Sequence, residues 1–80
     1  MAKPQTFHVL ASIKLDNEWN EWVWVGGFAL VRDGETSPAA VAQDACRVVN
    51  VARDRTVQIE VYNPETKLYD QRYTFKPLAF

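Results

Sequence analysis

The fold is decided by residues 37–53, which read SPAAVAQDACRVVNVAR. Apolar side chains recur in this stretch at about 100° per residue, the spacing of an α-helix, and predict a helix from Ser37 to Arg53. The Ser37 hydroxyl is suited to accept a hydrogen bond from the first turn, and Pro38 is tolerated at the first helical position. The expected apolar stripe is made of small residues: Val41, Ala45, Val48 and Ala52, widened by Ala42 and Val49. Such a helix can lie close to a sheet.

Extended segments flank the helix on both sides. Their apolar and polar residues alternate with a period of two, which is typical of strands with one buried face. The predicted strands are residues 6–15, 22–31, 56–63 and 68–76, and the second is interrupted by Gly26 and Gly27. The predicted fold class is α+β: one domain, residues 1–80, in which a small antiparallel sheet of about four strands carries the helix on one face, in the order strand, strand, helix, strand, strand.

Composition narrows the function classes. The chain has 80 residues, a formal net charge of −1, one cysteine and one histidine, and 48% of its residues are hydrophobic. This balance is typical of a folded domain and does not indicate a nucleic-acid-binding or membrane-binding protein. The apolar runs are too short for a membrane span, the start MAKPQ is unlike a secretory signal, and one cysteine excludes an internal disulfide, so a cytoplasmic location is expected.

One helix can cover only one face of such a sheet, yet the second strand is apolar on both sides. Without a register switch at the glycine pair, Val23, Val25, Ala29 and Val31 share one face, and Trp22, Trp24, Phe28 and Leu30 share the other. The small residues match the small-residue helix better. We therefore expect Trp22, Trp24 and also Phe28 on the uncovered face, where exposed aromatics form a contact surface. The alternative is that the tryptophans fill the core.

Carboxylates gather in the first half of the chain. The loop of residues 16–21 surrounds Trp19 with acids, and a second acidic group follows in the turn before the helix. An aromatic ringed by charge is a common composition at protein interfaces and would suit a basic partner surface, such as one that normally binds nucleic acid. The predicted partner-binding residues are Asp16, Glu18, Trp19, Glu21, Trp22, Trp24, Asp33 and Glu35. The alternative is that these charges only solvate the surface.

The sequence contains no recognisable catalytic or metal-binding set. His8 and Cys46 stand alone, without ligand spacing or a nucleophile signature, so we expect no enzyme activity, no metal site and no cofactor. Cys46 lies at the rim of the apolar stripe. There it is either a small core residue or, if exposed, the site of an intermolecular disulfide.

Two rival functions remain. Arg72, Lys76 and Lys14 could join Trp22 and Trp24 in an RNA-binding sheet face, because single-stranded nucleic acid binds stacking aromatics framed by cations. The chain could also be a structural homodimer that buries the tryptophan face.

In its size, near-neutral charge and strand–strand–helix–strand organisation around RDGETSPAAVAQDACRVV (residues 32–49), the chain resembles type I anti-CRISPR proteins, in particular the subtype I-C group. These are small phage-encoded inhibitors of bacterial defence. The resemblance is one of size, charge and order of elements over most of the chain, and it includes no diagnostic motif. No residue role is therefore carried over by position. It implies a non-enzymatic inhibitor that acts in the host cytoplasm, binds the CRISPR surveillance (Cascade) complex and blocks engagement of target DNA.

Overall fold

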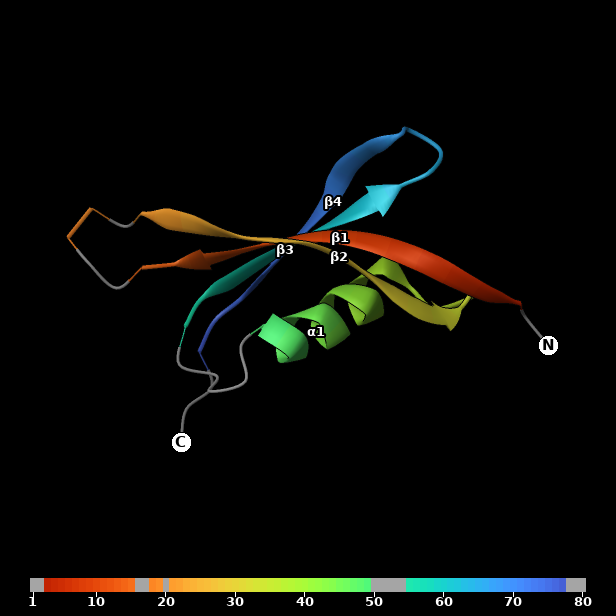
Figure 1. Ribbon diagram of the computed structural model, residues 1–80, viewed down its shortest axis with the longest axis horizontal. Helices are drawn as coiled ribbons and strands as arrows, with labels where there is room; N and C mark the ends of the chain where they lie inside the picture. The colour runs from red at the N-terminus through yellow and green to blue at the C-terminus, as the bar shows by residue number, and fades with distance from the viewer. Residues whose placement is uncertain (1–2, 16–17, 20, 50–54, 78–80) are drawn as a thin grey trace.

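The computed structural model describes residues 3–15, 18–19, 21–49 and 55–77. Its elements follow the order β1 (Pro4–Lys14), β2 (Trp22–Asp33), α1 (Pro38–Val49), β3 (Val57–Asn63) and β4 (Leu68–Phe75). The four strands form one antiparallel sheet in the order β2-β1-β3-β4. The α+β class and four-strand sheet predicted from the sequence are therefore present, with α1 lying against one face of the sheet (Figure 1).

The helix begins as its sequence predicts. The Ala40 N–H donates to Ser37 Oγ at 3.2 Å, and the Val41 N–H donates to the Ser37 carbonyl at 3.1 Å. Helix α1 ends at Val49, and the predicted last turn, residues 50–53, lies outside the described residues. The predicted stripe needs one correction, because Val48 is 57% exposed. The buried face is formed by Val41, Ala42 and Ala45, with Val49 at its margin.

The core lies between α1 and the two central strands. Val9 and Ala11 of β1 and Val57, Ile59 and Val61 of β3 are almost fully buried against the helix. Alternation then places the neighbouring side chains of both strands on the opposite face, which no helix of the described chain covers. The molecule is consequently thin, with principal extents of 46 × 28 × 15 Å.

The glycine pair switches the faces of β2. Ala11 pairs with Gly26, whereas Ser12 pairs with Trp24, so Val25 is an extra residue and forms a β-bulge. Gly26 has a φ of +150°, which L-residues rarely adopt. Before the bulge, the even-numbered residues of β2 point to the uncovered face. After the bulge, the even-numbered residues point to the helix side.

This switch corrects the expected faces of Phe28 and Leu30, and also those of Ala29 and Val31, which pair with His8 and Thr6 on the uncovered face. The expectation for Trp22 and Trp24 is confirmed. Phe28 and Leu30 pair with Val9 and Phe7 on the helix side, where they pack half-buried against the core. They therefore do not share a face with the tryptophans. Trp22 and Trp24 pair with Lys14 and Ser12 and lie on the uncovered face.

We predict that Gly26→Ala lowers the free energy of unfolding by about 1–3 kcal/mol, because an L-residue at this φ is strained. The space around a Cβ at this position is open, so the loss would come from the backbone alone. Urea unfolding followed by circular dichroism measures it. D-Alanine at position 26, introduced by chemical synthesis, is the matched control and should keep wild-type stability; equal stability of both variants would contradict the bulge geometry.

Candidate protein-binding arm

The β1–β2 hairpin extends beyond the end of α1 (Figure 1). We call the described residues of its distal part, 15, 18–19 and 21–25, the arm. Among the described residues, the exposed large apolar side chains are Trp19, Trp22, Val23, Trp24, Val25, Val31, Val48 and Leu68, and the first five of these belong to the arm. Their exposure follows from the geometry, because the described part of the chain provides no second layer over this end of the sheet. Within the residues that the structure describes, no other continuous segment exposes as many large apolar side chains as the arm.

The tip of the arm carries acids next to an aromatic ring. The Leu15 N–H donates to the Glu21 carbonyl at 2.7 Å and closes the base of the tip. Glu18, Trp19 and Glu21 are exposed, and the Trp19 side chain is 73% accessible. Asp16, the remaining predicted acid of the tip, lies outside the described residues. The described residues of the tip thus present an exposed indole with exposed carboxylates close to it in the chain.

Trp22 and Trp24 lie behind the tip on the uncovered face. Their accessible fractions are 44% and 66%. Lys14 is the cross-strand partner of Trp22, and Ser12 is the partner of Trp24. Two large rings and one ammonium group therefore share this end of the face.

The structure does not bring the second predicted acidic group to the same place. Asp33 and Glu35 are exposed at the opposite end of β2, about 36 Å from its start by the usual strand rise. Asp33 Oδ1 also accepts the Glu35 N–H at 2.8 Å, which shapes the turn before α1. Within one chain, the seven of these eight predicted residues that the structure describes consequently form two separate groups.

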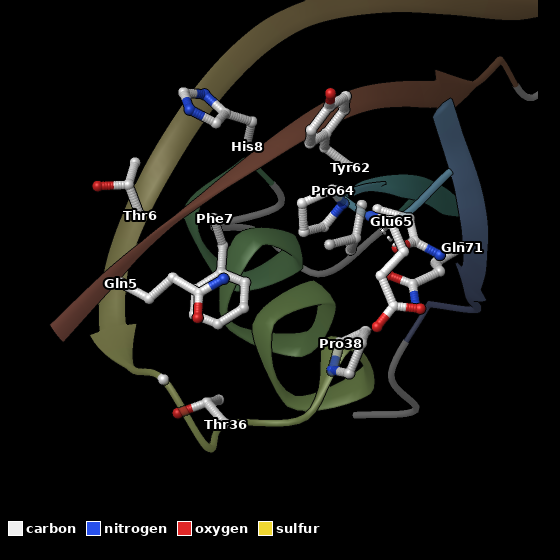
Figure 2. Close-up of a pocket in the computed structure, with 13 residues that line it drawn as sticks. Gln5, Thr6, Phe7, His8, Thr36, Pro38, Tyr62, Pro64, Glu65 and Gln71 are labelled. Carbon is white, nitrogen blue, oxygen red and sulfur yellow. Dashed lines mark hydrogen bonds between the residues drawn. The ribbon is translucent and has the colours of Figure 1, made fainter. Parts of the chain in front are cut away.

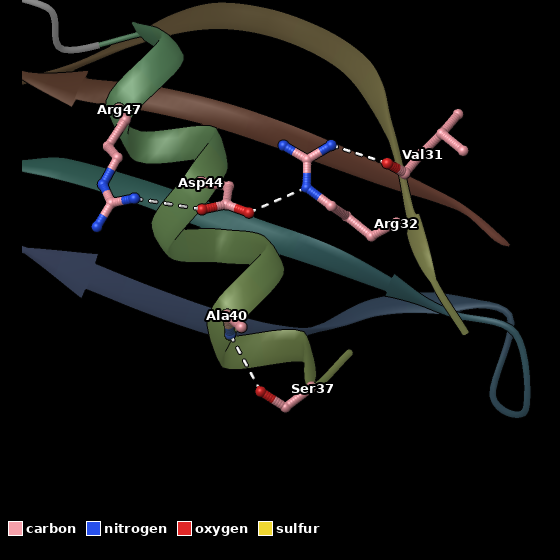
Figure 3. Close-up of polar contacts among 6 residues, drawn as sticks. All are labelled: Val31, Arg32, Ser37, Ala40, Asp44 and Arg47. Atoms are coloured by element: carbon pink, nitrogen blue, oxygen red, sulfur yellow. Dashed lines mark hydrogen bonds and ion pairs between the residues drawn. The ribbon is translucent and has the colours of Figure 1, made fainter. Parts of the chain in front are cut away.

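Asp44 has a structural partner. Its Oδ2 accepts Arg32 Nε at 3.0 Å, and its Oδ1 lies 3.6 Å from Arg47 Nη1 (Figure 3). Arg32 also donates to the Val31 carbonyl at 2.8 Å. The half-exposed Arg32–Asp44 pair ties α1 to the outer strand β2, whereas Arg47 and Asp44 both belong to α1; solvent screening keeps such contacts weak. Asp44 also belongs to the acidic first half of the sequence, but its carboxylate is shared by two arginines.

A row of rings crosses the uncovered face near its centre, and the sequence analysis missed it. The His8 and Tyr62 rings meet edge to face at 6.5 Å, and those of Tyr62 and Tyr69 at 5.2 Å. Alternation alone would place Tyr69 with Tyr73 and Phe75 on the helix side. A register shift between Val61 and Asn63 changes the facing of Tyr69, and only the turn of residues 63–67 hinted at such an irregularity.

A groove of about 410 Å³ opens where the first residues of β1 separate from the end of β3 (Figure 2). Strand β1 pairs with β3 only from Val9 to Ile13, so residues 4–8 diverge from the β3–β4 turn. Phe7 points toward α1 in this groove, whereas His8 and Tyr62 lie on the other side of β1. Pro38 and Pro64 contribute to the opposite walls. None of the described residues predicted to bind a partner lines it.

Cys46 is half-buried and packs against the core. This placement agrees with a small residue at the core margin, the first of the two roles considered from the sequence. The described residues include no group of three His, Cys, Asp or Glu side chains placed to hold a metal ion. No helix of the described chain is long and apolar enough to cross a membrane.

The chain matches no protein-family model, no curated protein and no solved structure. The candidate site therefore stands on its geometry alone.

We predict that unfolding changes the tryptophan emission maximum little, because all three indoles are already exposed in the native protein. Emission is recorded across a urea titration, in dilute solution, beside the far-ultraviolet circular dichroism that reports the cooperative loss of the sheet. Trp19→Phe, Trp22→Phe and Trp24→Phe assign the signal to individual rings. A native maximum typical of a buried indole would contradict the placement of the arm.

Proposed function

We propose that this chain is a non-enzymatic protein-binding module whose contact element is the arm. The observation that carries the proposal is the concentration of exposed apolar side chains on this one hairpin, outside the reach of α1. Soluble folds rarely expose contiguous large apolar residues without a partner for them, and tryptophan is the residue most enriched at interface hot spots. Removing such rings from water on binding supplies free energy without loss of core packing.

The charge of the tip indicates the chemistry of the partner. Glu18 and Glu21 flank Trp19, so the tip would dock to a basic surface that has an apolar recess for the indole. Proteins that bind nucleic acid present basic surfaces. Together with the resemblance to type I anti-CRISPR proteins, this chemistry supports an inhibitor that occupies a DNA-binding surface of the CRISPR surveillance complex and thereby blocks target DNA.

We predict that Glu18→Lys/Glu21→Lys abolishes binding to such a complex without unfolding the domain, because both carboxylates are exposed and the reversal places like charges together. Capture of purified type I surveillance complex by the tagged protein, followed by a DNA mobility-shift assay, measures binding and inhibition. The control Glu65→Lys/Asp70→Lys makes the same change in net charge at the β3–β4 turn and should bind as wild type. Undiminished binding by the tip variant would remove the acidic dock.

A second candidate function is direct binding of single-stranded nucleic acid to the uncovered face. It is favoured by the position of Lys14 beside Trp22, since stacking rings next to cations suit such a ligand. It is disfavoured by Glu60, whose carboxylate lies 3.7 Å from Arg72 and offsets its charge.

Fluorescence anisotropy with labelled single-stranded DNA and RNA at low salt separates the two candidates. The protein-binding proposal expects no change in anisotropy. A salt-dependent rise that Trp24→Ala removes would instead support the nucleic-acid-binding module.

A further inference from the structure

Strand β2 is an edge of the sheet, and its one irregularity is the β-bulge at Val25. The strand is the outermost on its side and runs for 12 residues, and no described segment pairs with its outer side. Residues 22–31 contain neither a charge nor a proline. The other edge strand, β4, is shorter and carries Asp70 and Arg72. Charged side chains and proline are what normally prevent edge strands from pairing, so the two edges differ in their tendency to associate.

We propose that a second copy of this chain pairs with β2, antiparallel about a two-fold axis perpendicular to the sheet, with Gly27 beside the partner's Gly27 and one β-bulge on each side of the axis. This pairing joins the two sheets into one of eight strands and leaves both helices on the same side. It goes beyond the proposed function, because Glu18, Trp19 and the uncovered face of each chain stay accessible.

The β-bulge makes this register consistent with the faces of β2. Cross-strand neighbours must point to the same side of a sheet. On the uncovered face, Trp22 lies beside the partner's Val31, and Trp24 lies beside the partner's Ala29. On the helix side, Val23 lies beside the partner's Leu30. Without the extra residue Val25, each of these pairs would point to opposite faces.

The pairing also covers an apolar side chain, Val23, that is exposed in a single chain. Val23 is 44% exposed because α1 does not reach the arm, whereas Leu30 packs half-buried at the margin of the core. In the dimer, Val23 meets the partner's Leu30 and extends the partner's apolar layer. The arrangement is isologous, so each such contact occurs twice.

Charge selects this register over its neighbours. In this register Glu21, the residue before β2, lies at the position opposite the partner's Arg32, whose guanidinium also contacts Asp44 of its own chain. A shift of two residues in one direction places Arg32 opposite the partner's Val23, and in the other direction it places Glu21 opposite the partner's Leu30. Both shifts set a charge against an apolar side chain, which disfavours pairing.

Sedimentation equilibrium over a concentration series tests the dimer. The wild-type chain should pass from one to two chain masses, and Val23→Lys should raise the dissociation constant by about tenfold or more, since each dimer would then hold two ammonium groups beside leucines. Leu68→Lys adds the same charge at an exposed apolar position of β4 and should leave the dissociation constant unchanged. A single-chain mass throughout the wild-type series, or equal weakening by both variants, would overturn the proposal.

A cysteine pair tests the register and does not depend on the folding of the lysine variant. In a Cys46→Ala background, Trp24→Cys/Ala29→Cys should form a disulfide-linked dimer on mild oxidation, because these positions are cross-strand neighbours between copies. Within one chain the two positions are about 17 Å apart, too far to bridge. The control Trp24→Cys/Val31→Cys matches the register shifted by two residues. Faster cross-linking of the control, or no cross-linking of either pair, would overturn the proposed pairing.

Discussion

The arrangement of this molecule depends on the β-bulge at Val25 and Gly26. A regular strand would present the same set of side chains to one face along its whole length. The extra residue lets β2 place Phe28 and Leu30 under the helix and, a few residues earlier, Trp22 and Trp24 on the other face. Both groups are large and apolar, but only the first contributes to the core. The glycine at φ +150° makes this division possible without a strained L-residue.

The helix layer sets the second constraint. Its buried face consists of Val41, Ala42 and Ala45, which allow close approach to the sheet but cover little area. The covered region therefore ends near the central strands, and the arm and the uncovered face remain outside it (Figure 1). The Arg32–Asp44 ion pair anchors the outer strand where the apolar layer ends. The small side chains of the helix therefore account both for the thin molecule and for the exposure of the arm.

Much of the fold could be predicted from local pattern. The Ser37 cap, the helical period and the alternation of Val57, Ile59 and Val61 are local signals, and each corresponds to the structure. The glycine pair marked the interruption of β2, but which residue is extra depends on pairing with β1, which no local pattern contains. The same reason explains Tyr69, whose facing depends on the register of β3 with β4.

The candidate site was predictable only in part. The composition of the tip identified Glu18, Trp19 and Glu21 as an exposed group. The separation of Asp33 and Glu35 from that tip follows from the length of β2, and the Arg32–Asp44 pair joins residues 12 positions apart in the chain. Both are properties of the assembled sheet.

The position of the arm outside the covered layer also has a consequence for how the protein evolves. Substitutions at Trp19, Trp22 or Trp24 remove few core contacts, so they cost little folding stability and are seldom purged for that reason. Lineages can therefore alter the rings and acids of this hairpin rapidly while the buried valines and isoleucine stay fixed. Under the proposed function, a change in the partner's surface would select new arm sequences on an unchanged scaffold.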